Sequence, residues 1–106
     1  MIHYQIWFDL KNKSSDHEFQ KNVKSFLDLI KQRGLILDYL ILRRKFGFGP
    51  EGIGEFNIHI VVDNIDTLDK ISELMIKGDK EILNIHKKMA KFIKNIKYGL
   101  YKRWMM

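Results

Sequence analysis

The sequence predicts an α+β fold in which an antiparallel sheet carries its helices on one face. Three observations lead to this prediction. Apolar and polar residues alternate over residues 2–10 and again over residues 55–63, which is the period of a half-buried strand. Apolar residues recur instead at helical spacing over residues 16–33 and 66–93. A glycine-rich segment, residues 46–54, separates two apolar runs and predicts the turn of a hairpin.

The first strand and the first helix have the clearest patterns. The strand turns Ile2, Tyr4, Ile6, Phe8 and Leu10 to one face and His3, Gln5, Trp7 and Asp9 to the other. Ser15 followed by Glu18 forms the pattern of a capping box, so the helix is expected to begin near Asp16. Gly34 can adopt the left-handed conformation of a helix end, so the helix is expected to stop after Arg33.

The next two strands flank the glycine-rich segment. Residues 35–42 are almost entirely apolar and too short for a confident helix, so they are interpreted as a strand. In the strand at residues 55–63, the inward residues are expected to be Phe56, Ile58, Ile60 and Val62. The hairpin between them predicts antiparallel neighbours.

Two helices and a last strand complete the chain. Asp66 is a candidate N-cap for the first of these helices, which stops at Gly78, and Asp79 is the N-cap candidate for the second. The apolar stripe of the second helix runs to Ile93. Alternation returns near Ile96 and predicts the last strand.

The resulting order, β-α-β-β-α-α-β, is that of a ferredoxin-like sandwich with spatial strand order 4-1-3-2. Right-handed crossovers place the helical segments on the same face of the sheet. The whole chain, residues 1–106, is expected to form one domain.

Composition limits the classes of function. The 106 residues contain no cysteine, which excludes a disulfide framework and any Cys-based metal or redox site. The start has no signal-peptide pattern, and no apolar run approaches the ~20 residues that span a bilayer. We therefore expect a cytoplasmic protein without a membrane role. The net charge of +6 comes mainly from Lys scattered along helices, so nucleic-acid binding is not favoured.

The sheet face away from the helices is the predicted functional surface. Its expected residues are His3, Gln5, Trp7, Asp9, Glu55, Asn57, His59, Tyr101 and Arg103, with either Tyr39 and Arg43 or Leu40 and Arg44 from the second strand. So large a mixed aromatic and apolar patch is expected to be covered. The simplest cover is a second copy of the chain packed sheet to sheet about a two-fold axis, which would enclose a cavity.

Over nearly its whole length the chain resembles the dimeric α+β-barrel branch of ferredoxin-like proteins. More narrowly, residues 6–10 (Ile-Trp-Phe-Asp-Leu), residues 43–50 and residues 54–56 are similar to a small bacterial family of unassigned function in that branch. The resemblance implies a homodimer and transfers no catalytic residue. The wider superfamily includes cofactor-free monooxygenases and haem proteins, whose signatures are not matched here.

Two motifs near the hairpin have competing interpretations. Gly47-x-Gly49-x-x-Gly52 spells a dinucleotide fingerprint, but a strand follows it where the fingerprint needs a helix, so it is interpreted as loop geometry. The long loop is a candidate lid or partner contact. The basic cluster Arg43, Arg44 and Lys45 is suited to a carboxylate or phosphate, or equally to nearby acidic side chains.

The histidines supply the candidate chemistry. His3 or His59 is a candidate general base, oriented by Asp9 or Glu55. The same histidines with Glu55 form a conceivable metal set, but the spacing is not diagnostic and no metal is predicted. His17 and His86 lie on predicted helices and are expected to be surface or edge residues.

The hypothesis from the sequence is a homodimer whose inter-sheet cavity binds or transforms a small organic molecule, with anions among the candidates. Catalytic candidates are His59, His3, Asp9 and Glu55; binding candidates are Gln5, Trp7, Asn57, Arg43, Arg44, Tyr101 and Arg103. No cofactor is expected. The alternatives are an RNA-recognition module, which needs aromatic residues on its first and third strands, and a purely structural or regulatory dimer.

Overall fold

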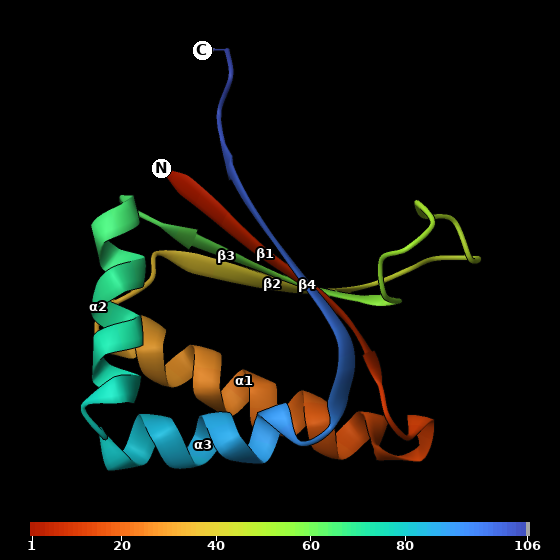
Figure 1. Ribbon diagram of the computed structural model, residues 1–106, viewed down its shortest axis with the longest axis horizontal. Helices are drawn as coiled ribbons and strands as arrows, with labels where there is room; N and C mark the ends of the chain where they lie inside the picture. The colour runs from red at the N-terminus through yellow and green to blue at the C-terminus, as the bar shows by residue number, and fades with distance from the viewer. Residues whose placement is uncertain (106) are drawn as a thin grey trace.

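The computed structural model describes residues 1–105 and places a four-stranded antiparallel sheet over a layer of helices (Figure 1). The elements are β1 (Ile2–Leu10), the 3-10 helix η1 (Lys13–Ser15), α1 (Asp16–Gln32), β2 (Asp38–Arg43), β3 (Phe56–Val62), α2 (Ile65–Ile76), α3 (Lys80–Ala90) and β4 (Ile93–Lys102). The strand order β2-β3-β1-β4, with antiparallel neighbours throughout, confirms the predicted ferredoxin-like sheet.

All the helices of residues 1–105 cover the same face of the sheet, as predicted. The helices α1 and α3 pack side by side beneath the strands, and α2 stands across one end of that layer (Figure 1). Gly34 and Gly78 end α1 and α2 with φ angles of 75° and 80°. None of the helices in the described residues has the length and apolar content that a membrane span requires.

The starts of the helices follow the predictions only in part. The Asp79 carboxylate accepts a hydrogen bond from the Ile82 N–H at 3.2 Å, which confirms the cap of α3. The capping box at α1 is wrong, because the Ser15 hydroxyl donates to the Asn12 carbonyl at 2.6 Å within the 3-10 turn that precedes the helix. Asp66 is also not a cap, since the N-cap of α2 is Asn64, two residues earlier, and Asp66 lies in the first turn of the helix.

Two strand boundaries differ from the predictions. The strand β2 begins at Asp38, because the Leu35 N–H still donates to the Ile30 carbonyl at 2.9 Å and closes the end of α1. The strand β4 begins at Ile93, where Ile93 pairs with Leu10. Ile93 fits both the apolar stripe of a helix and the inward side of a strand. Periodicity alone therefore could not separate the end of α3 from the start of β4.

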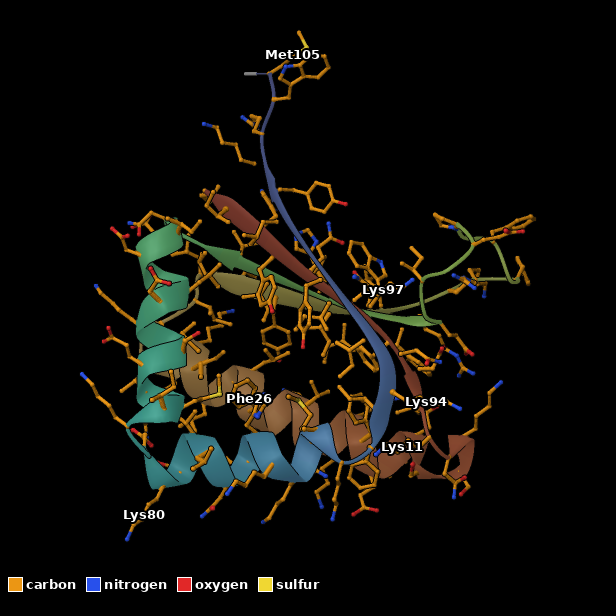
Figure 2. The ribbon with its side chains drawn as sticks, in the orientation of Figure 1. Lys11, Phe26, Lys80, Lys94, Lys97 and Met105 are labelled. Atoms are coloured by element: carbon orange, nitrogen blue, oxygen red, sulfur yellow. The ribbon has the colours of Figure 1, made fainter. Side chains whose placement is uncertain are left out.

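The core lies between the inner face of the sheet and the helices, where Figure 2 shows the Phe26 side chain within the layer. Phe8 has no exposed surface. Its ring stacks on Phe56 at a centroid distance of 5.6 Å and meets the edge of Phe19 at 5.2 Å. Burial of each such side chain stabilises the fold by about 1.5–3 kcal/mol. The predicted inward residues of β1 and β3 therefore form the core.

The hairpin loop joins β2 to β3, so the glycine motif opens no helix. Gly47 and Gly52 adopt positive φ angles of 72° and 82°, which is the loop geometry expected of them. Phe46 and Phe48 at the tip are 82% and 81% exposed and contact no part of the core. The loop closes at Gly54, whose backbone lies directly against the backbone of Phe8.

A Gly54→Ala substitution tests that close approach. A methyl group there would clash with the carbonyl group of Phe8, which is held in the central strand. We expect the free energy of unfolding, measured by chemical denaturation, to fall by about 1–3 kcal/mol. Gly49→Ala is the control, because the atoms nearest to its methyl group belong to the Arg44 side chain, which can move more readily than a backbone carbonyl in the central strand. Equal effects of the two substitutions would contradict the prediction.

Candidate functional site

The outer face of the sheet is not covered by any helix of residues 1–105, and we call it the open face. The strand register arranges its residues in rows: Asp38, Val61, His3 and Tyr101; Leu40, His59, Gln5 and Gly99; Leu42, Asn57, Trp7 and Lys97. The sequence left open which residues of β2 face outward. The register places Leu40 and Leu42 on the open face and Tyr39 on the inner face.

Two of the candidate residues touch on the two central strands, toward one end of the open face. His3 Nδ1 and His59 Nε2 lie 2.8 Å apart, at hydrogen-bonding distance. One ring must donate and the other accept, so at least one imidazole is neutral. Burial, with a further contribution from His3, lowers the pKa of His59. His59 is therefore uncharged at neutral pH.

Asp9 and Glu55 lie at the other end of the strands, away from the histidines. Asp9 accepts hydrogen bonds from the Glu55 N–H at 2.9 Å and from Asn95 Nδ2 at 3.1 Å, and these hold its pKa below the usual value. The Glu55 carboxylate pairs with Arg43 at 2.6 Å and with Lys13 at 3.7 Å. Within residues 1–105, neither carboxylate contacts an imidazole, so the structure does not assemble the expected pair of His and carboxylate.

The two arginines of the basic cluster take opposite faces. Arg43 lies on the inner side, with its guanidinium 5.2 Å from the centroid of the Phe56 ring. Arg44 turns toward the open face but donates to the Ile53 carbonyl at 2.9 Å and to the Pro50 carbonyl at 3.3 Å. Both guanidiniums are thus used to hold the strand ends and the hairpin loop. The anion site considered from the sequence is not preformed here.

The remaining candidates are two aromatic residues that contact each other, a buried amide and an exposed arginine. The rings of Trp7 and Tyr101 meet edge to face at 6.4 Å over Gly99, where the missing side chain leaves them room. The Asn57 amide donates to the Ile6 carbonyl at 3.3 Å and is buried. Arg103 follows the end of β4 and is exposed. No group of three potential metal ligands occurs within a single chain over residues 1–105.

A cavity of about 550 Å³ lies on the other side of the sheet, between its inner face and the helices, and we call it the internal cavity. Its walls come from β1, β3 and β4 above and from all of the α-helices below: Tyr4, Ile6, Phe19, Phe26, Ile30, Ile58, Ile60, Leu68, Ile71, Ser72, Met75, His86, Met89, Ala90, Ile93, Ile96, Tyr98 and Leu100. Tyr98 and Leu100 face inward, opposite Ile6 and Tyr4, yet are more than half exposed. The helices therefore do not cover β4, and the cavity opens beneath that strand.

The internal cavity holds few polar groups, and burial shifts the pKa of two of them. Burial, with the nearby Tyr98, raises the pKa of Tyr4 to about 12. Burial alone lowers the pKa of His86. The Tyr4 and Tyr98 rings stack at 6.0 Å, and the His86 ring meets the edge of Phe26 at 5.6 Å. Within residues 1–105 no hydrogen bond engages the Tyr4 hydroxyl or the His86 nitrogens, so these groups can bond to a ligand.

The sequence did not predict this cavity. His86 was expected as a surface or edge residue of its helix, whereas it lines the cavity. A signal was present in the sequence. His86 lies four residues after Ile82 on the apolar stripe of α3, and Tyr4 interrupts the aliphatic inner side of β1. Polar aromatic residues in apolar stripes are candidates for a cavity lining.

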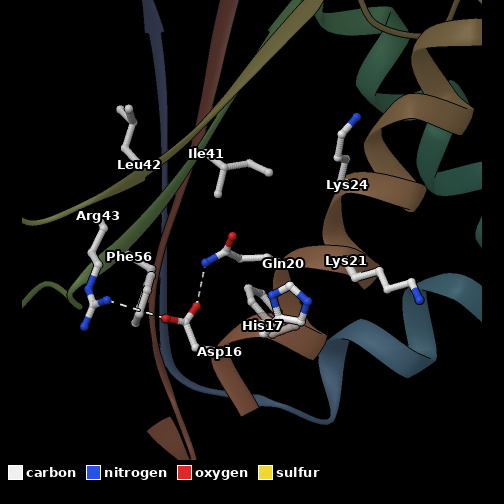
Figure 3. A pocket seen from close by; sticks show the side chains of 10 residues that line it. Asp16, His17, Gln20, Lys21, Lys24, Ile41, Leu42, Arg43 and Phe56 are labelled. Carbon is white, nitrogen blue, oxygen red and sulfur yellow. Dashed lines mark hydrogen bonds and ion pairs between the residues drawn. The ribbon is translucent and has the colours of Figure 1, made fainter. Parts of the chain in front are cut away.

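A groove of about 570 Å³ runs between α1 and the free edge of β2 (Figure 3). Ile41 and Phe56 line it, and Arg43 reaches across it to the Asp16 carboxylate at 3.5 Å. Lys24 on its rim pairs with Asp28 at 2.6 Å. Because Asp16, Lys24 and Arg43 are paired within the chain, the groove offers less to a ligand than the internal cavity does.

Comparison with known proteins identifies a family but no activity. The profile of DUF6614, described as a family of unknown function, matches residues 1–105. No curated protein sequence matches the chain significantly.

Solved structures similar to this chain share its fold at low sequence identity. SnoaB from Streptomyces nogalater, a cofactor-independent oxygenase, is 10% identical with a TM-score of 0.72, over 99% of this chain and 94% of that chain. A dimeric protein of unknown function and ferredoxin-like fold from Bacteroides fragilis is 14% identical, with a TM-score of 0.60 and coverage of 96% and 95%. A dimeric ferredoxin-like protein from an uncultured marine organism is 12% identical, with a TM-score of 0.64 and coverage of 99% and 91%.

The half-buried, apolar environment of His86 predicts a pH dependence of stability. Its folded pKa lies below the unfolded value of about 6.5, so the unfolded chain binds more protons as the pH falls. Stability from this group is present above that value and is lost as the pH falls through it toward the folded pKa. We expect the free energy of unfolding, measured by chemical denaturation at pH 7.5 and 5.5, to change less with pH in His86→Leu than in the unmodified protein. The reduction is at most about 1.4 kcal/mol per pH unit.

The control for this experiment is His17→Leu, since His17 is exposed on α1. It should leave the pH dependence as in the unmodified protein. An unchanged pH dependence in His86→Leu would show that the residue is not buried as the structure has it.

Proposed function

The chain belongs to the DUF6614 family of unknown function, and we propose that it is a homodimer in which each protomer binds a small apolar molecule in its internal cavity. The observation that carries the proposal is the cavity itself, with a volume of about 550 Å³ and walls that are almost entirely apolar. Ligand sites in proteins are commonly of this size and combine an apolar lining with a few convergent polar groups.

The polar groups of the cavity favour an uncharged ligand. Tyr4 keeps its proton at neutral pH because its pKa is about 12, and His86 is neutral because its pKa is lowered. Neither supplies a charge to hold an anion, and both can exchange hydrogen bonds with a hydroxyl or carbonyl group. The aromatic rings of Tyr98 and Phe26 add flat surfaces. The ligand proposed is therefore a neutral, largely apolar molecule with one or two hydrogen-bonding oxygens.

This proposal moves the ligand from the inter-sheet space to the internal cavity. On the open face, Asp9, Arg44 and Asn57 are engaged in bonds that hold strands and loop. The cavity groups have no such partner within residues 1–105. The open face is then available as the dimer interface.

The cytoplasmic location expected from the sequence stays a prediction.

Two apolar patches support dimerisation through the open face. Leu40 and Leu42 on β2 form the leucine patch and are 55% and 46% exposed. Trp7 and Tyr101 form the aromatic patch on β1 and β4. An isologous pair of open faces can place each leucine patch on the aromatic patch of the partner. Two similar proteins of known structure are described as dimeric, which supports the same arrangement.

The RNA-recognition alternative is less well supported. An RNA-binding sheet of this order stacks bases on aromatic residues of its first and third strands. The open face of β3 carries Asn57, His59 and Val61, and the second aromatic residue lies on β4 instead.

Light scattering of the purified protein tests the dimer. We expect twice the mass of the chain for the unmodified protein and at least a tenfold weaker association for Leu40→Arg, since the new charge would be buried against the partner. Ile76→Arg is the matched control, because Ile76 is an exposed apolar residue at the end of α2, away from the open face. An unmodified protein that is monomeric at all concentrations would contradict the proposed dimer.

A neutral fluorescent probe, N-phenyl-1-naphthylamine, tests the internal cavity. We expect saturable binding at one probe per protomer. Ala90→Phe places a ring where Ala90 lines the cavity and should weaken binding at least tenfold.

The control is Asn84→Phe, which adds the same ring to an exposed position of α3. Unchanged probe binding in a folded Ala90→Phe protein would contradict the cavity as the site, whatever the result for the dimer.

A further inference from the structure

The contact between His3 and His59 is the cluster of potential metal ligands that the proposed function leaves unused. The nitrogens that face each other are 2.8 Å apart. A tetrahedral ion with bonds of about 2.0–2.1 Å holds two imidazole nitrogens about 3.3 Å apart, so a shift of about 0.5 Å would admit one ion between the rings. Both side chains are on adjacent central strands that fix their position.

A single chain cannot complete a metal site at this point. Within residues 1–105 no third His, Asp or Glu side chain joins the pair, and the sequence contains no Cys. Asp38, in the same row as His3, is occupied by its contacts to Lys31 at 3.4 Å and to the Tyr39 N–H at 2.8 Å. Further protein ligands must therefore come from a second chain.

The partner protomer of the proposed dimer would supply these ligands, because the two-fold axis brings equivalent residues of the two chains together. The leucine patch lies on one side of β3 and the aromatic patch on the other, in the order β2-β3-β1-β4. If each patch packs on the other patch of the partner, the axis passes midway between them, over β3 and β1. His59 lies in the middle row there and His3 in the next row. Residues near a two-fold axis meet their own copies. Facing sheets are about 10 Å apart, a gap that side chains from both sheets fill.

We propose that the dimer binds one divalent transition-metal ion on its two-fold axis through His3 and His59 of both protomers. The inference rests on the dimer of the proposed function and adds a site to it. Four imidazoles suit Zn²⁺, Cu²⁺ or Ni²⁺, which prefer nitrogen ligands, and exclude Mg²⁺ and Ca²⁺, which need oxygen. The ion would bridge the protomers at the centre of the interface.

Zinc binding to the chelator-stripped full chain tests the site. Equilibrium dialysis against Zn²⁺ with metal analysis should give one ion for every two chains. His59→Gln and His3→Gln should each weaken binding at least a hundredfold while leaving the circular dichroism spectrum unchanged. His17→Gln is the control, because that imidazole is exposed on α1. Leu40→Arg should lose zinc binding together with the dimer.

The outcomes separate the site from the dimer. A protein that is dimeric in EDTA but does not bind zinc, or binds it equally after His3→Gln and His59→Gln, would overturn the metal site alone. Zinc bound at one ion per chain by monomeric Leu40→Arg would also overturn it. A protein that is monomeric both with and without zinc would overturn the dimer as well.

Discussion

The contact of Phe8 with Phe19 and Phe56 is the interaction on which the rest of the structure depends. Phe8 belongs to β1, which pairs with both β3 and β4. Its burial against α1 sets which face of this central strand looks inward. A shift of one residue in strand pairing would turn every side chain of β1 to the opposite face of the sheet. The free-energy cost of exposing Phe8 to solvent therefore stabilises the observed register. His3, Gln5 and Trp7 face outward for that reason.

The two faces of the sheet have different chemistry because the helices cover only one of them, and only in part. Beneath β1 and β3, core residues of α1 such as Phe26 also form one wall of the internal cavity. The cavity opens beneath β4, which the helices do not cover, and it holds Tyr4 and His86 in apolar surroundings. On the open face the polar groups at the strand ends bond to the chain itself. The structure therefore separates a surface suited to a second protomer from a space suited to a ligand.

Much of this arrangement follows from local patterns. The alternation of residues 2–10 and 55–63 predicted both the strands and the faces of their side chains, and Asp79 and Gly78 correctly marked the break between α2 and α3. The contact between His3 and His59 was considered from the same patterns. The position of Asp9 was predicted, but not its partners, since its carboxylate bonds to backbone and amide groups from two other segments.

The sequence by itself determined the order of the elements and the face to which the residues of β1 and β3 point, because periods of two and of 3.6 residues are local properties. Only the tertiary structure decided that Arg44 and not Arg43 faces outward, that both guanidiniums are already engaged, and that His86 lines a cavity. Those features depend on register between strands and on the distance between helices and sheet. Packing of side chains far apart in the chain sets both, and no periodicity in one segment reports it.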